Sequence, residues 1–214
     1  MEHLQELFSA AISHPDVAVL SVATRPDCLP EAVLELLEKL NQIKPVWVEL
    51  GLQTIHEDTA KAIRRGYALP VYEQAVEALK KRGISVITHV ILGLPGESRA
   101  QMLETVRYVG RHTDGIKLQL LHVLRGTDLA ADYELGKFQT LELEEYCRLI
   151  ADCLRHLPKE VVIHRLTGDG AKKDLIAPLW SGNKKNVLNT LNRILSEEDV
   201  QQGELTNPSE SAIL

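Results

Sequence analysis

Residues 84–97, ISVITHVILGLPGE, decide the fold of this chain. A mostly apolar, β-branched run enters a Gly-Leu-Pro-Gly turn, and Ser98 with Gln101 then offers the Ser-x-x-Gln capping box of a new helix. The segment therefore predicts a strand, a tight loop and a helix. Gly93 and Gly96 have no Cβ, so the backbone there can bend sharply and lie against a ligand, while the helix start presents free N–H donors.

Composition sets the outer limits of the function. The chain has 214 residues, 44% of them apolar, which is enough for one sizeable core. Its net charge of −6 gives no electrostatic footprint for nucleic acid, so binding of RNA or DNA would need a local basic patch. No signal peptide and no run of 18 apolar residues is found in the sequence, which favours a cytoplasmic protein that does not bind a membrane.

The cysteines point to no metal centre. Cys28, Cys147 and Cys153 are odd in number and widely spaced. They form no C-x-x-C or C-x-x-x-C-x-x-C group, so neither a disulfide framework nor an iron–sulfur site can be derived from them. Cys147 and Cys153 fall in a helical pattern and are most simply small core residues.

Strand and helix patterns alternate along the chain, with strand starts about 29 to 39 residues apart over the first four. Repeated βα units of this kind predict a parallel sheet. We expect an irregular segment over 126–139, a last helix over about 184–196 and a disordered, acidic tail over 197–214. The five expected strands cover 17–24, 46–53, 85–92, 116–124 and 160–166.

The strand over 46–53 has two chemically different faces, because successive side chains alternate. One face is aliphatic, whereas Trp47, Glu49, Gly51 and Gln53 share the other. An open parallel sheet is normally apolar on both faces, so a face with a carboxylate and an amide is better placed inside a barrel or half-barrel, near the ligand-binding strand ends.

The same alternation in the central strand puts His89 on one face with Gly93. In the strand over 116–124, Lys117 and His122 fall on opposite faces. A bulge or a change of face must therefore intervene, and the alternation does not decide which side faces inward.

Four short motifs follow one another in a characteristic order: Thr24-Arg25-Pro26-Asp27, Glu49-Leu50-Gly51-Leu52-Gln53, Arg64-Arg65-Gly66 and Gly93-Leu94-Pro95-Gly96-Glu97. They resemble the later two-thirds of a radical S-adenosylmethionine (SAM) domain, most closely in the branch of the elongator catalytic subunit and the coproporphyrinogen dehydrogenases. The segments 115–130, 143–158, 161–169 and 175–188 resemble the small YhcC-like family. The resemblance covers about residues 15–196.

The resemblance implies an α/β fold, a partial, TIM-like (β/α)6 barrel. Members hold a [4Fe–4S] cluster through a C-x-x-x-C-x-x-C-type loop, and SAM completes its coordination. One electron from the cluster cleaves SAM to a radical that abstracts hydrogen from the substrate. Residues 1–196 would then be the C-terminal two-thirds of such a barrel, with a family-specific extension over about 126–196.

The sequence departs from this pattern at its start. It contains no cysteine triad, and the first two strands of a normal member have no counterpart. We therefore expect an N-terminally truncated barrel that cannot ligate the cluster alone and is inactive alone. A separate N-terminal half, a second copy of the chain or the chain's own N-terminal helix is expected to cover the open barrel edge.

Two residues carry the main SAM contacts that the resemblance implies. Gln53 matches a glutamine that contacts the ribose or the methionine part. Arg65, twelve residues later, matches the arginine that pairs with the SAM carboxylate, chemistry suited to a planar fork of donors. Structural alternatives stay open: Arg65 can complement a helix C-terminus, and Gln53 can be a buried amide bonded to backbone.

Further SAM contacts are expected around these two. His89 stands where related branches place a ribose-binding acid. Ala23 occupies the position of a glutamate that some branches use on the SAM amino group, so that contact is either missing or replaced by Thr24 or Arg25. Gly93 and Leu94 are expected beside the adenosine.

A second set of residues is assigned to the substrate or to a family-specific role. Glu49 needs a partner if buried, and Lys117 can supply one, in which case the two form a structural pair. His122, His164 and Asp169 lie near or beyond strand ends, and ordinary loop or core roles stay open for them.

Three functions remain open. The first is part of a radical SAM enzyme with an unknown substrate. The second is a non-catalytic remnant or interaction protein built on the same half-barrel. The third is a metal-dependent hydrolase using His89, His122 and His164, but no aspartate stands suitably beside them, so we expect no metal bound by this chain.

Overall fold

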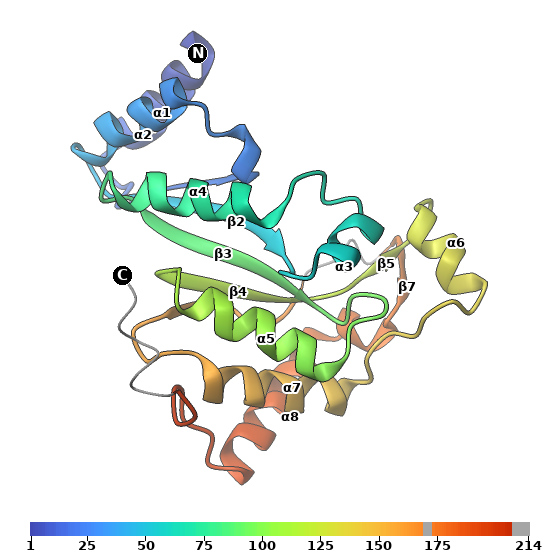
Figure 1. The fold of residues 1–214 in the computed structure, drawn as a ribbon. Coiled ribbons are helices and arrows are strands. Elements are labelled where there is room, and N and C mark those ends of the chain that lie inside the picture. Colours follow the sequence, from blue (N-terminus) through green and yellow to red (C-terminus); the bar gives the residue numbers. More distant parts are fainter. Residues whose placement is uncertain (169–172, 207–214) are drawn as a thin grey trace.

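The computed structural model describes residues 1–168 and 173–206 (Figure 1). Its main sheet is parallel, with strand order β1-β2-β3-β4-β6. This confirms the α/β fold with a parallel sheet that the repeated βα pattern predicts. The strands are β1 Leu20–Thr24, β2 Val46–Gln53, β3 Ser85–Leu92, β4 Gly115–Leu120 and β6 Val162–Arg165.

The helices follow the strands in the expected order. The capping box of the central unit is present: the Ser98 side chain accepts from the backbone of Gln101, whose side chain accepts from the backbone of Ser98. The helices are α1 Glu2–Ser13, α2 Glu31–Asn41, α3 Glu57–Ala62, α4 Leu69–Lys80, α5 Arg99–Gly110, α6 Asp128–Glu134, α7 Leu143–His156 and α8 Lys184–Glu197. Among the described residues, no helix combines the length and the apolar character needed to cross a bilayer.

The two faces of β2 differ as the alternation predicts. Val46, Val48, Leu50 and Leu52 are completely or almost completely buried, whereas the side chains between them are half-buried. Helices α2, α4 and α5 pack against the sheet, and α7 and α8 extend this layer (Figure 1). The aliphatic face therefore belongs to the main core, and the polar face is left for a site.

The expected strand over 116–124 is interrupted. It ends as β4 at Leu120 and restarts as β5, Val123–Leu124, which pairs antiparallel with β7, Leu175–Ala177. The segment 126–139, expected to be irregular, contains α6. Thr127 caps this helix by accepting from the Ala130 backbone N–H at 3.1 Å. One face of α6 packs on β5 and β7 in a small second core, so tertiary contacts stabilise a helix too short to show a periodic pattern.

The expected tail is wrong for residues 198–206, which the structure places against α7. Leu205 donates a backbone hydrogen bond to Arg155 O at 2.8 Å, and Arg155 pairs with Glu204 at 2.6 Å. Glu198 and Glu204, whose charge is typical of a solvated tail, thus pair with Arg155, more than forty residues earlier in the chain. Residues 207–214, the rest of that tail, lie outside the described part of the chain.

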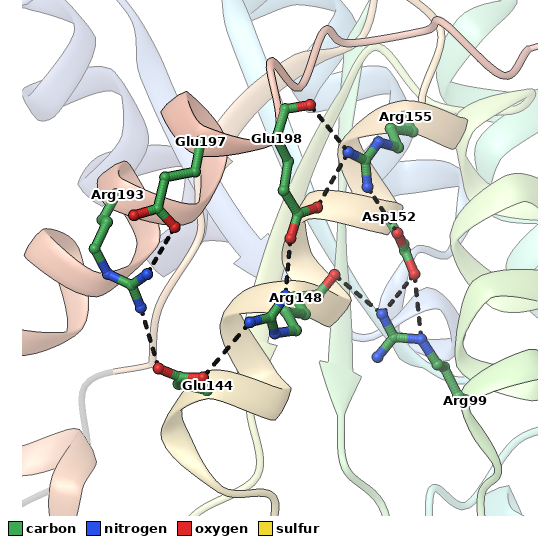
Figure 2. Close-up of polar contacts among 8 residues, drawn as sticks. All are labelled: Arg99, Glu144, Arg148, Asp152, Arg155, Arg193, Glu197 and Glu198. Carbon is green, nitrogen blue, oxygen red and sulfur yellow. Dashed lines mark hydrogen bonds and ion pairs between the residues drawn. The ribbon is translucent and has the colours of Figure 1, made fainter.

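A chain of ion pairs joins α5, α7 and the end of α8 (Figure 2). Arg99 on α5 pairs with Asp152 on α7 at 2.5 Å, and Asp152 also pairs with Arg155 at 3.1 Å. Each exposed pair contributes only about 0–1 kcal/mol, but a connected network holds several side chains at once. Its members are Arg99, Glu144, Arg148, Asp152, Arg155, Arg193, Glu197, Glu198 and Glu204.

Candidate functional site

A cavity of about 630 Å³ lies at the carboxyl ends of the parallel strands. Small-molecule sites typically measure about 300–1,000 Å³ and occur at this edge of parallel sheets. One wall follows β2 and the loop after α3, another is the loop after β3, and α6 with the residues after it forms the outer wall. Gly51, Gln53, Arg65, Tyr67, Leu94 and Phe138 are among the lining residues.

Gln53 is held in an unusual backbone conformation at this cavity. Its φ is +68°, in the left-handed region, and the register of β2 with β3 shifts between Gly51 and Gln53. The amide folds back over Gly51, where an added Cβ would lie 2.6 Å from Gln53 Nε2. Gly51 therefore makes room for the amide. A non-glycine residue fixed in this region is an observation typical of functional sites.

Arg65 also lines the cavity, and its side chain is only 1% exposed. Its Nη1 donates to Thr54 O at 2.7 Å, its Nε to Tyr67 O at 2.8 Å and its Nη2 to Glu57 Oε1 at 2.7 Å. Those two carbonyls belong to loop residues, so the side chain does not serve as a simple cap of α3. A ligand carboxylate would have to use its remaining N–H groups.

Of the other residues predicted to contact SAM, some line the cavity and others do not. Arg25 and Leu94 line the cavity. Arg25 is held by Asp27 through two hydrogen bonds of 2.9 and 2.7 Å. Thr24 and Gly93 are not in the described lining; Gly93, with φ +85°, packs against the Leu141 side chain instead.

A polar network occupies the face of the sheet just below this cavity. Glu49 Oε2 accepts from Lys117 Nζ at 2.5 Å and from His89 Nε2 at 2.7 Å, while Glu49 Oε1 accepts from Ser21 Oγ at 2.8 Å. Gln119 Nε2 lies 3.1 Å from His89 Nδ1. The Glu49–Lys117 pair is thus present, and β4 turns Lys117 and Gln119 toward this face.

The network determines the protonation states of Glu49 and His89. Burial raises the pKa of Glu49, but the hydrogen bonds from Lys117, Ser21 and His89 outweigh it and lower the pKa to about 2. Burial lowers the pKa of His89, against the opposing effect of Glu49. His89 is therefore neutral at pH 7, with Nε2–H donating to Glu49 and Nδ1 accepting from Gln119.

This network should make stability depend on pH. The pKa of Glu49 is lower in the folded chain than its usual 4.5, so its contribution is complete above about pH 4.5 and is lost as the pH falls toward 2. At about 1.36 kcal/mol per pKa unit the upper limit is about 3 kcal/mol. In urea denaturation between pH 6 and pH 2, the wild type should be more stable than Glu49→Gln at pH 6 and should lose this difference in the free energy of unfolding as the pH falls. A difference that is constant with pH would contradict this assignment.

His89 lies next to the cavity rather than in its described lining. It is opposite Gly51 in the register of β2 with β3, and its ring turns to Glu49, one step deeper on the same face. Gln53 and Arg65 therefore share the cavity wall, and His89 belongs to the network beneath it.

The remaining predicted residues lie apart from one another. His122 Nε2 is 3.0 Å from Ser181 Oγ, in the C-terminal extension. His164 packs edge-on to Trp47 with ring centroids 5.2 Å apart. Asp169 lies outside the described residues. Within the described ranges, no three His, Cys, Asp or Glu side chains form a possible metal site, and the three histidines of the hydrolase hypothesis contact different partners.

Tyr67 and the outer wall formed by α6 were not predicted from the sequence. The only signal for Tyr67 is its position directly after the Arg64-Arg65-Gly66 motif. The Tyr67 hydroxyl donates to Gly51 O and its ring contacts two arginines, relations that depend on tertiary structure.

Comparison with known proteins identifies the family. The Radical SAM superfamily model matches residues 2–109, and the Radical_SAM C-terminal domain model matches residues 113–197. Uncharacterized protein YtqA of Bacillus subtilis is 44% identical over 204 residues, 95% of this chain and 63% of that protein. Protein YhcC of Escherichia coli K12 is 40% identical over 207 residues, 96% of this chain and 67% of that protein. The chain thus spans about two-thirds of the length of these relatives.

Solved structures agree in fold. The archaeal Methanocaldococcus infernus Elp3 with an N-terminal deletion superposes with a TM-score of 0.77 at 22% identity, covering 93% of this chain and 46% of that chain. Its likeness supports the arrangement of parallel strands and helices. The matching domain models and the two similar relatives show that the chain belongs to the radical SAM superfamily, in the family of YhcC and YtqA, and membership of this superfamily implies SAM and a [4Fe–4S] cluster as cofactors.

Proposed function

We propose that this chain is the SAM-binding part of a radical SAM protein with a partial (β/α)6 barrel, and that SAM occupies the cavity at the strand ends. The observation that carries the proposal is the cavity itself. Its wall brings together Gln53 and Arg65, which match SAM-contacting residues of the family, with Arg25 and Leu94 from two further strand ends.

Each lining residue has a role suited to its chemistry. Arg25, whose side chain is half-exposed, would bind the SAM carboxylate, and the buried positive charge of Arg65 would support it from the wall, since guanidinium groups pair well with planar anions. The Gln53 amide, which can both donate and accept, would bond the ribose or the methionine part. Leu94 would pack against the adenosine. His89 lies beneath the cavity, and its neutral ring would support the site through its hydrogen bonds with Glu49 and Gln119.

The cluster does not fit the residues of this chain. Cys147 and Cys153 are buried in α7, where burial raises the pKa of both thiols, to about 11 for Cys147. Cys28 is exposed and lies on another part of the chain. A cluster needs thiolate ligands gathered at one point. In the complete enzyme the cluster would supply the electron for reductive SAM cleavage and hydrogen abstraction from an unknown substrate, and we propose that this chain alone is inactive.

Binding of SAM to the purified chain tests the proposal. Equilibrium dialysis with labelled SAM should show one saturable site, and Gln53→Ala should weaken it about tenfold, the effect of one well-placed hydrogen bond. Lys81→Ala, which removes an exposed ion pair on the helical layer, is the matched control and should leave binding unchanged. Saturable binding unaffected by Gln53→Ala would place SAM elsewhere.

Anaerobic reconstitution with iron and sulfide tests the second half of the proposal. We expect no stoichiometric [4Fe–4S] absorbance on the chain alone. A bound cluster would show that cysteines of this chain suffice. A folded chain that binds neither SAM nor a cluster would favour the non-catalytic alternative, an interaction protein on the same scaffold.

A further inference from the structure

Tyr67 contacts three separate parts of the cavity wall. Its hydroxyl donates to Gly51 O at the end of β2. Its backbone carbonyl accepts from Arg65 Nε at 2.8 Å. Its ring lies 4.8 Å from the Arg65 guanidinium carbon and 5.6 Å from that of Arg25, measured to the ring centroid. One side chain therefore joins the wall segments that follow β1, β2 and α3.

These contacts hold two like charges at one cavity. Arg25 and Arg65 would repel each other, whereas the face of an aromatic ring attracts a guanidinium. Asp27 pairs with Arg25 at 2.7 Å, and Glu57 pairs with Arg65 at 2.7 Å. Each guanidinium is therefore held by one carboxylate and by the shared ring of Tyr67.

Gly66 lets this arrangement form. Its φ is +86°, and a Cβ added there would lie 3.1 Å from Arg25 Nη2. The glycine thus allows Arg25 to reach the ring of the next residue. Burial raises the pKa of Tyr67 to about 12, so its hydroxyl stays protonated and donates to Gly51 O throughout the neutral range.

We infer that Tyr67 is a positioning residue of the SAM site: it holds Arg25, Arg65 and the Gly51–Gln53 bulge in the arrangement that binds the ligand. This inference rests on the proposed function. Tyr67 acts through its neighbours, because its hydroxyl and ring are engaged by protein groups. Loss of the hydroxyl frees the bulge, and loss of the ring also frees the two arginines.

Two substitutions separate the hydroxyl from the ring. In equilibrium dialysis, Tyr67→Phe should weaken SAM binding about fivefold, the effect of one ordinary hydrogen bond. Tyr67→Leu should weaken it at least about thirtyfold, because two cation–π contacts are lost as well. Tyr108→Phe is the matched control: its hydroxyl bonds Glu73 at 2.5 Å, outside the described lining of the cavity, and its removal should leave binding unchanged.

A double-mutant cycle distinguishes positioning from a general loss of stability. If Tyr67 acts through the bulge, Tyr67→Phe should cost little further affinity once Gln53→Ala is present, since the two changes remove one shared interaction. Full additivity of the two effects on the SAM dissociation constant would overturn the inference.

A measurement without SAM keeps the inference separate from the proposed function. In ¹H–¹⁵N spectra, the Nε–H signals of Arg25 and Arg65 should stay in place in Tyr67→Phe and move in Tyr67→Leu, because only the second variant removes the ring. If the wild type does not bind SAM, the proposed function fails. If the signals do not respond to loss of the ring, Tyr67 does not hold the arginines and the inference fails.

Discussion

Replacing Arg65 with methionine should lower the free energy of unfolding by about 3–5 kcal/mol, the usual effect of breaking a buried charged interaction. The variant leaves Thr54 O, Tyr67 O and the Glu57 carboxylate without the donors that now bond them. Urea denaturation at pH 7, followed by circular dichroism, measures the change. Because Arg65 also lines the cavity, the variant should lose SAM binding even under conditions where it remains folded.

Arg64 provides the matched control for this prediction. It is the neighbouring residue with the same side chain, but it is 78% exposed and pairs with an equally exposed Asp128. Arg64→Met should therefore change the free energy of unfolding by less than about 1 kcal/mol. Equal effects of the two substitutions on the free energy of unfolding would show that the buried contacts of Arg65 do not stabilise the fold.

Replacing Lys117 with methionine should lower the free energy of unfolding by about 3 kcal/mol, because Glu49 would then be a largely buried carboxylate without its cationic partner. Only Ser21 and His89 would still donate to it. The same substitution should raise the pKa of Glu49, since Lys117 provides the largest of the effects that lower it. Denaturation curves at several pH values measure both changes.

Two further variants test whether this effect comes from the pair. Adding Glu49→Gln to Lys117→Met removes the uncompensated charge and should restore part of the stability. Lys137→Met breaks the Lys137–Asp132 pair, whose side chains are 59% and 46% exposed, and should cost less than about 1 kcal/mol. A double variant less stable than Lys117→Met alone would rule out the charge pair as the cause.

The central βα unit was predictable because its local signals agree with the tertiary structure. The apolar run, the Gly-Leu-Pro-Gly turn and the Ser98–Gln101 capping box each favour the same local structure, and β3 and α5 have the expected positions. The period of two in β2 also separated a buried aliphatic face from a half-buried polar one. Lys117 could be offered as a partner because a buried carboxylate needs one, but the alternation in 116–124 did not decide which side of that strand faces inward.

Other features depend on contacts between distant residues and leave little trace in the local pattern. The pairing of β5 with β7 joins segments about fifty residues apart, and α6 has too few turns to show a period. Residues 198–206 are ordered by Arg155 and its neighbours on α7, although their composition is that of a tail. The contact of Tyr67 with Gly51 likewise becomes visible only when β2 and the loop after α3 are placed together.

The His89 prediction shows where counting along a strand stops being sufficient. Alternation correctly placed His89 on the polar face, but its distance from the cavity depends on the register shift after Gly51. Gln53, which follows the shift, lines the cavity wall, whereas the ring of His89 bonds Glu49. Family resemblance supplied the candidate ligand for these residues, and the three-dimensional arrangement assigned them to two adjoining layers of one site.

A crystal structure of the purified chain grown with SAM gives the most direct test of the central claim. We expect the ligand in the cavity at the carboxyl ends of β1 to β4, with its carboxylate at the arginines and its ribose or methionine part at Gln53. Electron density for SAM at any other place, or an empty cavity at a SAM concentration that saturates the chain in solution, would contradict it.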